Sequence, residues 1–136
     1  MTRGAAGRPA DLALLLARLV TGAFLIHEVW DNIADRARMR EFAGFLAVHR
    51  FPAPTLLAPA TVYAQLAMGL LLIAGGFVRA TGAALAAMFA VAVVMVHRAQ
   101  SPREIWPAAA LVLIGALLAA IGGGRYALDA RRGRGR

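Results

Sequence analysis

The sequence predicts an all-α protein, namely an integral membrane bundle of four helices with a short amphipathic helix between the first two spans. The chain of 136 residues is 60% hydrophobic and has a mean hydropathy of +0.66, whereas soluble domains contain about 45–50% apolar residues. Its apolar residues gather into four long runs, and each run approaches the roughly 17–25 residues that cross a hydrocarbon core. The runs do not alternate apolar with polar residues, which favours helices over the strands of a barrel.

The four predicted spans form a single domain, and they cover residues 12–29, 56–77, 81–96 and 105–121. Only the residues around Arg79 separate the second run from the third, which predicts a tight antiparallel hairpin. Residues 122–136 form a tail. We expect its last six residues, RRGRGR, to be disordered and solvated.

Small residues recur on the third and fourth spans, at a spacing of four that places them on one helix face. They are Gly82, Ala86 and Ala90 on the third span and Gly115 and Ala119 on the fourth. This pattern is typical of membrane helices that pack closely together.

The connection between the first and second spans contains the predicted amphipathic helix. Within residues 36–50, the apolar residues Met39, Phe42 and Leu46 fall at helical spacing among charged residues, which favours a helix lying in the membrane interface. Pro52 and Pro54 then end it, because proline cannot continue a helix and disfavours one just before it.

The charge of the chain predicts its orientation in the membrane. The net charge of +8 comes from arginines, with no lysine, and these arginines lie at the ends of the apolar runs and not on one basic soluble face with interleaved aromatics. We therefore expect no nucleic-acid binding. Eight arginines fall on the side of the termini and six on the other. This bias predicts a multi-pass protein of the bacterial inner membrane with both termini in the cytoplasm, anchored at the interfaces by Trp30, Trp106 and Arg79.

A cleaved signal peptide and cysteine chemistry are both disfavoured. No small-residue cleavage site follows a brief apolar core, so the first run is interpreted as a retained helix. The chain has no cysteine, which excludes disulfides, thiolate catalysis and iron–sulfur ligation by its own residues.

Polar residues from three spans are predicted to meet at the outer face of the bundle. His27 and Glu28 end the first span, His97 ends the third and Glu104 begins the fourth. They indicate either a shallow polar pocket or ordinary interfacial anchoring, which also places polar residues at helix ends. Two histidines on separate helices, without a repeated Glu-x-x-His motif, do not indicate a metal site.

Two polar residues lie inside the spans. Arg18, on the first, either snorkels to the interface or turns into the bundle. We predict the inward orientation, with Gln65, Tyr63 or backbone carbonyls as acceptors. Gln65 lies near the middle of the second span, where it can form a hydrogen bond between helices.

Over nearly its whole length the chain resembles the DoxX family of small four-helix bacterial membrane proteins. The residues that carry the resemblance are Arg18 followed by GAFLIH, FPAP before the second span, YAQLAMGLLLIAGGFVRATG across the hairpin, His97, and the closing GGGRYALDA. The last segment is similar to the family's Gly-x-Gly-(Arg/Lys)-x-Ser-Leu-Asp-Ala. The chain departs from the family at Glu28 and Asp31, where a glycine and a lysine are usual. It departs again at Gln65, where the family usually has a glutamate.

The resemblance implies an integral membrane accessory subunit of a redox-associated complex, which contributes helix packing and a quinone or lipid pocket. The candidate pocket residues are Arg18, His27, Glu28, Gln65, His97 and Glu104. The partners implied are membrane lipid and other membrane or redox subunits, and quinone is the one cofactor implied, because the chain shows no redox centre of its own. Two alternatives are a quinone-linked oxidoreductase subunit of the thiosulfate:quinone type and a small-solute transporter. The transporter is disfavoured because the chain shows no inverted repeat or broken helix.

Overall fold

The computed structural model describes residues 7–97 and 100–134, and these residues form helices and no strand. The elements are α1 (Gly7–Ala34), α2 (Arg36–Val48), α3 (Pro54–Ala74), α4 (Val78–Ala92), a π-helical turn η1 (Val93–His97), α5 (Pro102–Ile121) and α6 (Leu128–Arg134). Four of the helical stretches are long and apolar enough to cross a membrane, namely α1, α3, α4 with η1, and α5. The predicted all-α membrane bundle is therefore confirmed.

The helix boundaries differ most from the predicted spans at α1 and at the hairpin between α3 and α4. Helix α1 is longer at both ends, and its 28 residues extend over about 42 Å at 1.5 Å per residue. The hairpin between α3 and α4 consists of Gly75, Gly76 and Phe77, and Arg79 already belongs to α4. This turn needs a left-handed backbone, with φ of 79° at Gly75 and 50° at Phe77.

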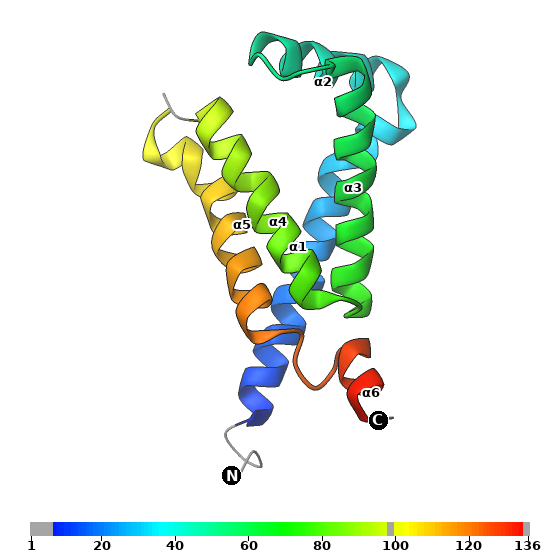
Figure 1. Cartoon of the computed structure of the whole chain (residues 1–136), viewed down its shortest axis with the longest axis vertical. Coiled ribbons are helices and arrows are strands. Elements are labelled where there is room, and N and C mark those ends of the chain that lie inside the picture. The colour runs from blue at the N-terminus through cyan, green and yellow to red at the C-terminus, as the bar shows by residue number, and fades with distance from the viewer. Residues whose placement is uncertain (1–6, 98–99, 135–136) are drawn as a thin grey trace.

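The four spans are arranged as two helix pairs, α1 with α3 and α4 with α5 (Figure 1). The pairs meet at the end of the bundle where α1 begins and α6 lies, and they diverge toward the end that carries α2. We call these the terminal end and the α2 end. Because the number of spans is even, both termini lie at the terminal end (Figure 1).

Glycines hold each helix pair at close range. A Cβ atom built on Gly22 would lie 2.6 Å from the carbonyl oxygen of Gly69, and one on Gly69 would lie 2.9 Å from that of Gly22. Gly82 and Gly115 show the same reciprocal approach between α4 and α5, with 2.6 Å in both directions. The close contact predicted from the small residues on α4 and α5 is confirmed, whereas the contact between α1 and α3 was not predicted.

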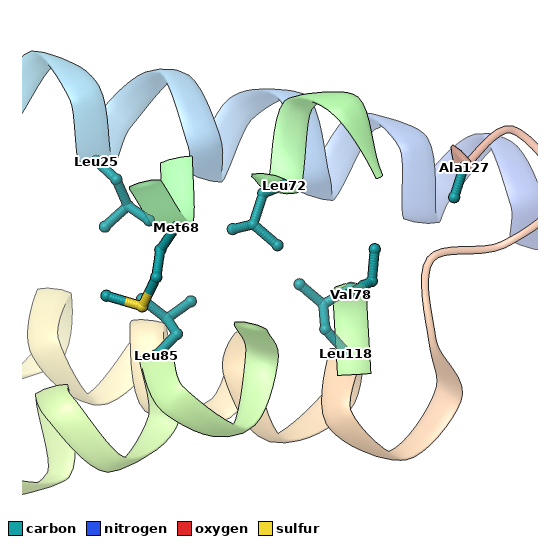
Figure 2. Close-up of a cluster of buried hydrophobic side chains, with 7 residues drawn as sticks. All are labelled: Leu25, Met68, Leu72, Val78, Leu85, Leu118 and Ala127. Carbon is teal, nitrogen blue, oxygen red and sulfur yellow. The ribbon is translucent and has the colours of Figure 1, made fainter. Parts of the chain in front are cut away.

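The buried apolar core lies between the two pairs. Figure 2 shows its side chains, which come from α1, α3, α4, α5 and the C-terminal segment: Leu25, Met68, Leu72, Val78, Leu85, Leu118 and Ala127. Toward the α2 end this packing gives way to a cavity, which is described below.

Helix α2 agrees with the predicted amphipathic helix, and α6 does not agree with the predicted tail. The side chain of Asp35 accepts a hydrogen bond from the Ala37 N–H and caps α2, and Leu46 is the buried residue of that helix. The expectation of disorder from Arg131 onward is wrong as far as Arg134, because α6 includes these residues. Residues 135 and 136 lie outside the described part of the chain.

Candidate functional site

The guanidinium of Arg18 is fully buried at the terminal end and donates hydrogen bonds to backbone carbonyls only. Its Nη1 atom donates to the carbonyl oxygens of Leu72, at 2.9 Å, and Ile73, at 3.4 Å. Its Nε atom donates to Gly123 at 3.1 Å, and Nη2 to Tyr126 at 3.2 Å. Leu72 and Ile73 are in the last turn of α3, where the carbonyl oxygens receive no hydrogen bond from an N–H group of their own helix. Arg18 therefore caps the C-terminus of a neighbouring helix.

The inward orientation predicted for Arg18 is confirmed, but its predicted acceptors Gln65 and Tyr63 are not its partners. Arg18 is also one of the candidate pocket residues, but it does not line the α2-end cavity described below. It lies near the terminal end, level with the last turn of α3, whose carbonyls it contacts.

Two further charged side chains cap helices at the terminal end. Arg79, predicted as an interfacial anchor, donates to the carbonyl oxygens of Ala120 at 2.9 Å and Ile121 at 3.3 Å, which end α5. The carboxylate of Asp129 accepts from the N–H groups of Phe77 and Val78, both at 2.8 Å, and so caps the start of α4. A negative charge at this position also interacts favourably with the helix dipole.

The C-terminal segment, residues 123–130, connects these caps. It supplies the carbonyls of Gly123 and Tyr126 to Arg18, and the N–H of Asp129 donates to the carbonyl of Gly75 at 3.1 Å. The N–H of Arg125 donates to the carboxylate of Asp11 on α1 at 3.1 Å. The terminal end thus contains a network of helix caps, in which the polar groups named above have structural roles.

The α2 end contains the candidate site, a cavity of about 350 Å³ that we call the α2-end cavity. Its volume falls within the range of about 300–1,000 Å³ that is usual for small-molecule sites. All four spans and α2 contribute to its lining: Phe24, Glu28, Val29, Asn32, Phe42, Thr61, Val62, Gln65, Phe89, Glu104, Pro107, Ala108 and Leu111.

Three of the candidate pocket residues line this cavity together: Glu28 from α1, Gln65 from α3 and Glu104 from α5. His27 is exposed and is not part of the lining, because consecutive residues of a helix point about 100° apart around its axis. His97 ends η1, but its side chain lies outside the part of the chain that the structure describes. Trp30 and Trp106, the predicted interfacial anchors, are both exposed.

Hydrogen bonds position two of these polar side chains. The Nε2 atom of Gln65 donates to the carbonyl oxygen of Leu25 at 3.4 Å, which joins α3 to α1 as predicted. The Oε2 atom of Glu104 accepts from the N–H of Ser101 at 3.1 Å and from its hydroxyl at 3.2 Å. Glu104 therefore supports the start of α5 and also lines the cavity.

The sequence did not indicate the aromatic part of the site. Phe24, Phe42 and Phe89 come from three different helices and line the same cavity. Phe42 also stacks on Phe45, with ring centroids 6.3 Å apart. When each helix is considered alone, its phenylalanine looks like an ordinary core residue or an ordinary lipid-facing residue. The one available signal was their common depth with Glu28 and Glu104.

The described residues contain no group of three or more His, Asp or Glu side chains that could hold a metal ion. The cavity instead combines apolar and aromatic walls with two carboxylates and two amides, from Asn32 and Gln65. Such a lining binds an organic molecule by shape, through the apolar wall, and fixes its orientation through a few polar contacts.

Comparison with known proteins supports the family resemblance. No curated protein and no solved structure matches the chain. The model of the DoxX family matches residues 13–98, which include most of α1, all elements from α2 to η1 and most of the cavity lining, while the closing GGGRYALDA lies beyond the matched range. The match covers more than half of the sequence, and the chain therefore belongs to the DoxX family.

Proposed function

We propose that the protein is a non-catalytic integral subunit of a redox-associated membrane complex, and that its α2-end cavity holds a quinone or a lipid taken from the bilayer. In this proposal the protein lies in a bacterial inner membrane with both termini in the cytoplasm, so that the cavity faces the outer leaflet. The observation that carries the proposal is the lining of the cavity, to which all four spans contribute and in which an apolar wall meets polar side chains.

The lining is suited to an amphipathic ring or chain. The phenylalanines offer faces for stacking or for contact with an acyl chain. The amide groups of Asn32 and Gln65 supply N–H donors for a carbonyl oxygen such as that of a quinone. A bound quinone would contribute the redox chemistry, and the chain's own residues would bind and orient it.

Exposed apolar side chains on the spans support the subunit role. Each of the four spanning helices presents large apolar residues outward, among them Leu16, Leu70, Val91 and Leu117. Such a surface accommodates either lipid or the helices of another membrane protein, because both are apolar.

The test is purification of the tagged full-length chain from native membranes in a mild detergent, followed by mass spectrometry of co-purified proteins and of extracted quinones and lipids. Ala108→Phe fills the cavity from α5, and Ala116→Phe, on an exposed face of the same helix, is the matched control. We expect redox proteins and a stoichiometric quinone or lipid with the unaltered chain and with Ala116→Phe, and loss of the small molecule with Ala108→Phe. Full retention of the small molecule by Ala108→Phe, or the absence of both redox partners and a bound small molecule, contradicts the proposal.

A further inference from the structure

We propose that the α2-end cavity selects for positively charged ligands, that is, lipophilic organic cations in which an ammonium-type or delocalised charge is attached to an apolar body. The inference rests on the proposed function in one respect only, that this cavity is a ligand site. It does not depend on membership of a redox complex.

The first observation is the charge of the lining. The chain carries 15 arginines against seven acidic residues, yet the cavity-lining residues among residues 7–96 and 100–131 include two glutamates and neither arginine nor histidine. Low-dielectric walls concentrate the field of the charges that line a cleft. The described lining residues therefore create a negative electrostatic potential in this cavity, although the net charge of the protein is strongly positive.

The second observation is that neither glutamate forms an ion pair with a side chain in the described part of the chain. Among the described side chains, the ion pair found is that between Arg38 and Glu41 on α2, at 3.4 Å. Glu28 forms no hydrogen bond or ion pair with another described residue. Glu104 uses Oε2 to accept from Ser101, and its Oε1 atom remains without a described partner. Both carboxylates can therefore accept from a ligand.

The third observation is the aromatic wall. Phe24, Phe42 and Phe89 reach the cavity from α1, α2 and α4, and the face of an aromatic ring attracts an organic cation within about 6 Å of its centroid. An inorganic cation would need several oxygen ligands in place of its water, and phenylalanine cannot supply them. Aromatic faces together with carboxylates therefore match a cation whose charge is spread over or surrounded by carbon.

The same features exclude anions. A ligand of net negative charge in this cavity would face Glu28 and Glu104 with no compensating arginine among the described lining residues. Like charges repel each other, and the repulsion is stronger where apolar walls lower the local dielectric constant. The sign of the ligand's charge is thus the property that the lining discriminates.

Two probes of matched shape and opposite charge test the inference, tetraphenylphosphonium and tetraphenylborate. Binding of each is measured by equilibrium dialysis against the full-length chain in lipid nanodiscs, and empty nanodiscs give the background of membrane partitioning. We expect saturable binding of tetraphenylphosphonium and no saturable binding of tetraphenylborate. Saturable binding of both probes with similar affinity, or of neither, overturns the inference.

Isosteric variants assign the selectivity to the two carboxylates. Glu28→Gln and Glu104→Gln keep the shape of the side chain, and we expect each to weaken tetraphenylphosphonium binding by about threefold or more, with a larger loss in the double variant. Asp31→Asn is the matched control, because this exposed carboxylate lies on α1 three residues after Glu28 and does not line the cavity. Unchanged binding in the double variant, in a chain that still elutes as a folded protein, contradicts the inference.

The two proposals fail separately. If a quinone or lipid co-purifies and is lost with Ala108→Phe, while both charged probes bind equally, the proposed function stands and the charge selectivity is wrong. If redox partners are absent and tetraphenylphosphonium still binds through Glu28 and Glu104, the charge selectivity stands without the proposed complex.

Discussion

At the scale of single residues, Arg18 shows what the sequence can and cannot specify. A guanidinium in an apolar run is costly, so the sequence indicates that it needs acceptors or a route to water. Its acceptors are backbone carbonyls in the last turn of α3 and in the C-terminal segment. Every residue has a backbone carbonyl, so the sequence does not show which carbonyls lack an N–H partner. The position of such a carbonyl depends on where α3 ends and on how the C-terminal segment folds back.

Replacement of Arg18 is expected to destabilise the whole bundle. Arg18→Lys keeps the charge but loses the planar fork that reaches acceptors from two parts of the chain. Buried carbonyls left without donors cost about 1–3 kcal/mol each, so we expect a loss of about 3 kcal/mol or more. The midpoint of thermal unfolding, read as loss of the monodisperse peak after heating in detergent, should fall by several degrees. Arg103→Lys, on an exposed position of α5, should leave it unchanged. An unaltered midpoint in Arg18→Lys would show that the carbonyl contacts contribute little.

At the scale of elements, the two helix pairs use the same contact, but the sequence displays it in only one of them. On α4 and α5, Gly82 and Gly115 are followed by alanines at four-residue spacing, so the interface is visible as a stripe. On α1 and α3, Gly22 and Gly69 stand among larger residues, and a single glycine in a leucine-rich helix gives no such stripe. The pairing of these two glycines depends on the register between the helices, which no pattern within one helix reports.

Replacement of one of these glycines by alanine should push the two helices of the pair apart. The added methyl group of Gly22→Ala or Gly82→Ala would lie 2.6 Å from a backbone carbonyl oxygen of the partner helix. Backbone atoms cannot move aside without shifting a helix, and such overpacking costs about 1–3 kcal/mol.

The matched control is Gly44→Ala on α2, where no atom lies within 4 Å of the added carbon. There alanine should be neutral or stabilise by up to about 1 kcal/mol, because glycine is a poor helix former. The midpoints of thermal unfolding in detergent give the comparison. Equal effects at Gly22 and Gly44 would refute the close packing of α1 on α3.

Asp129 should stabilise the folded protein, because it caps α4 from a distant part of the sequence. It accepts hydrogen bonds from the first N–H groups of α4, 52 and 51 residues earlier in the sequence. Loss of an N-cap side chain costs about 0.5–2 kcal/mol, so Asp129→Ala should lower the midpoint of thermal unfolding, and Asp129→Asn should lower it less because the amide oxygen still accepts. Asp31→Ala, at an exposed position of α1, is expected to have no effect. Equal midpoints for the Asp129 and Asp31 variants would contradict the capping role.

At the scale of the whole molecule, one end of the bundle carries the network of helix caps and the other holds the α2-end cavity. That Glu28, Gln65 and Glu104 share one site could be anticipated in part, since Glu28 ends an outward span and Glu104 begins an inward one, which brings both to the same face. That Arg18 takes part in helix capping instead could not, because its acceptors are backbone carbonyls of α3 and of the C-terminal segment, whose places depend on the fold. The aromatic wall was equally hidden, since it forms only when three helices converge.

The orientation of the molecule in the membrane can be tested with single cysteines, because the chain contains none of its own. Ser101→Cys lies at the α2 end and Arg131→Cys at the terminal end, and both positions are exposed. With the termini in the cytoplasm, as the distribution of arginines predicts, a membrane-impermeant maleimide should label Ser101→Cys in intact spheroplasts. It should label Arg131→Cys only after lysis. The reverse pattern would invert the proposed topology.

The burial of Arg18 also determines the order in which the protein can mature during synthesis. Two of the carbonyls that receive its guanidinium, those of Gly123 and Tyr126, follow it by 105 and 108 residues, and all four spans precede them. During synthesis every membrane-crossing helix therefore precedes these two acceptors, whereas the carbonyls of Leu72 and Ile73 are already present once α3 has been made. The guanidinium of Arg18 reaches its full set of hydrogen bonds only after residues 123–126 have been added.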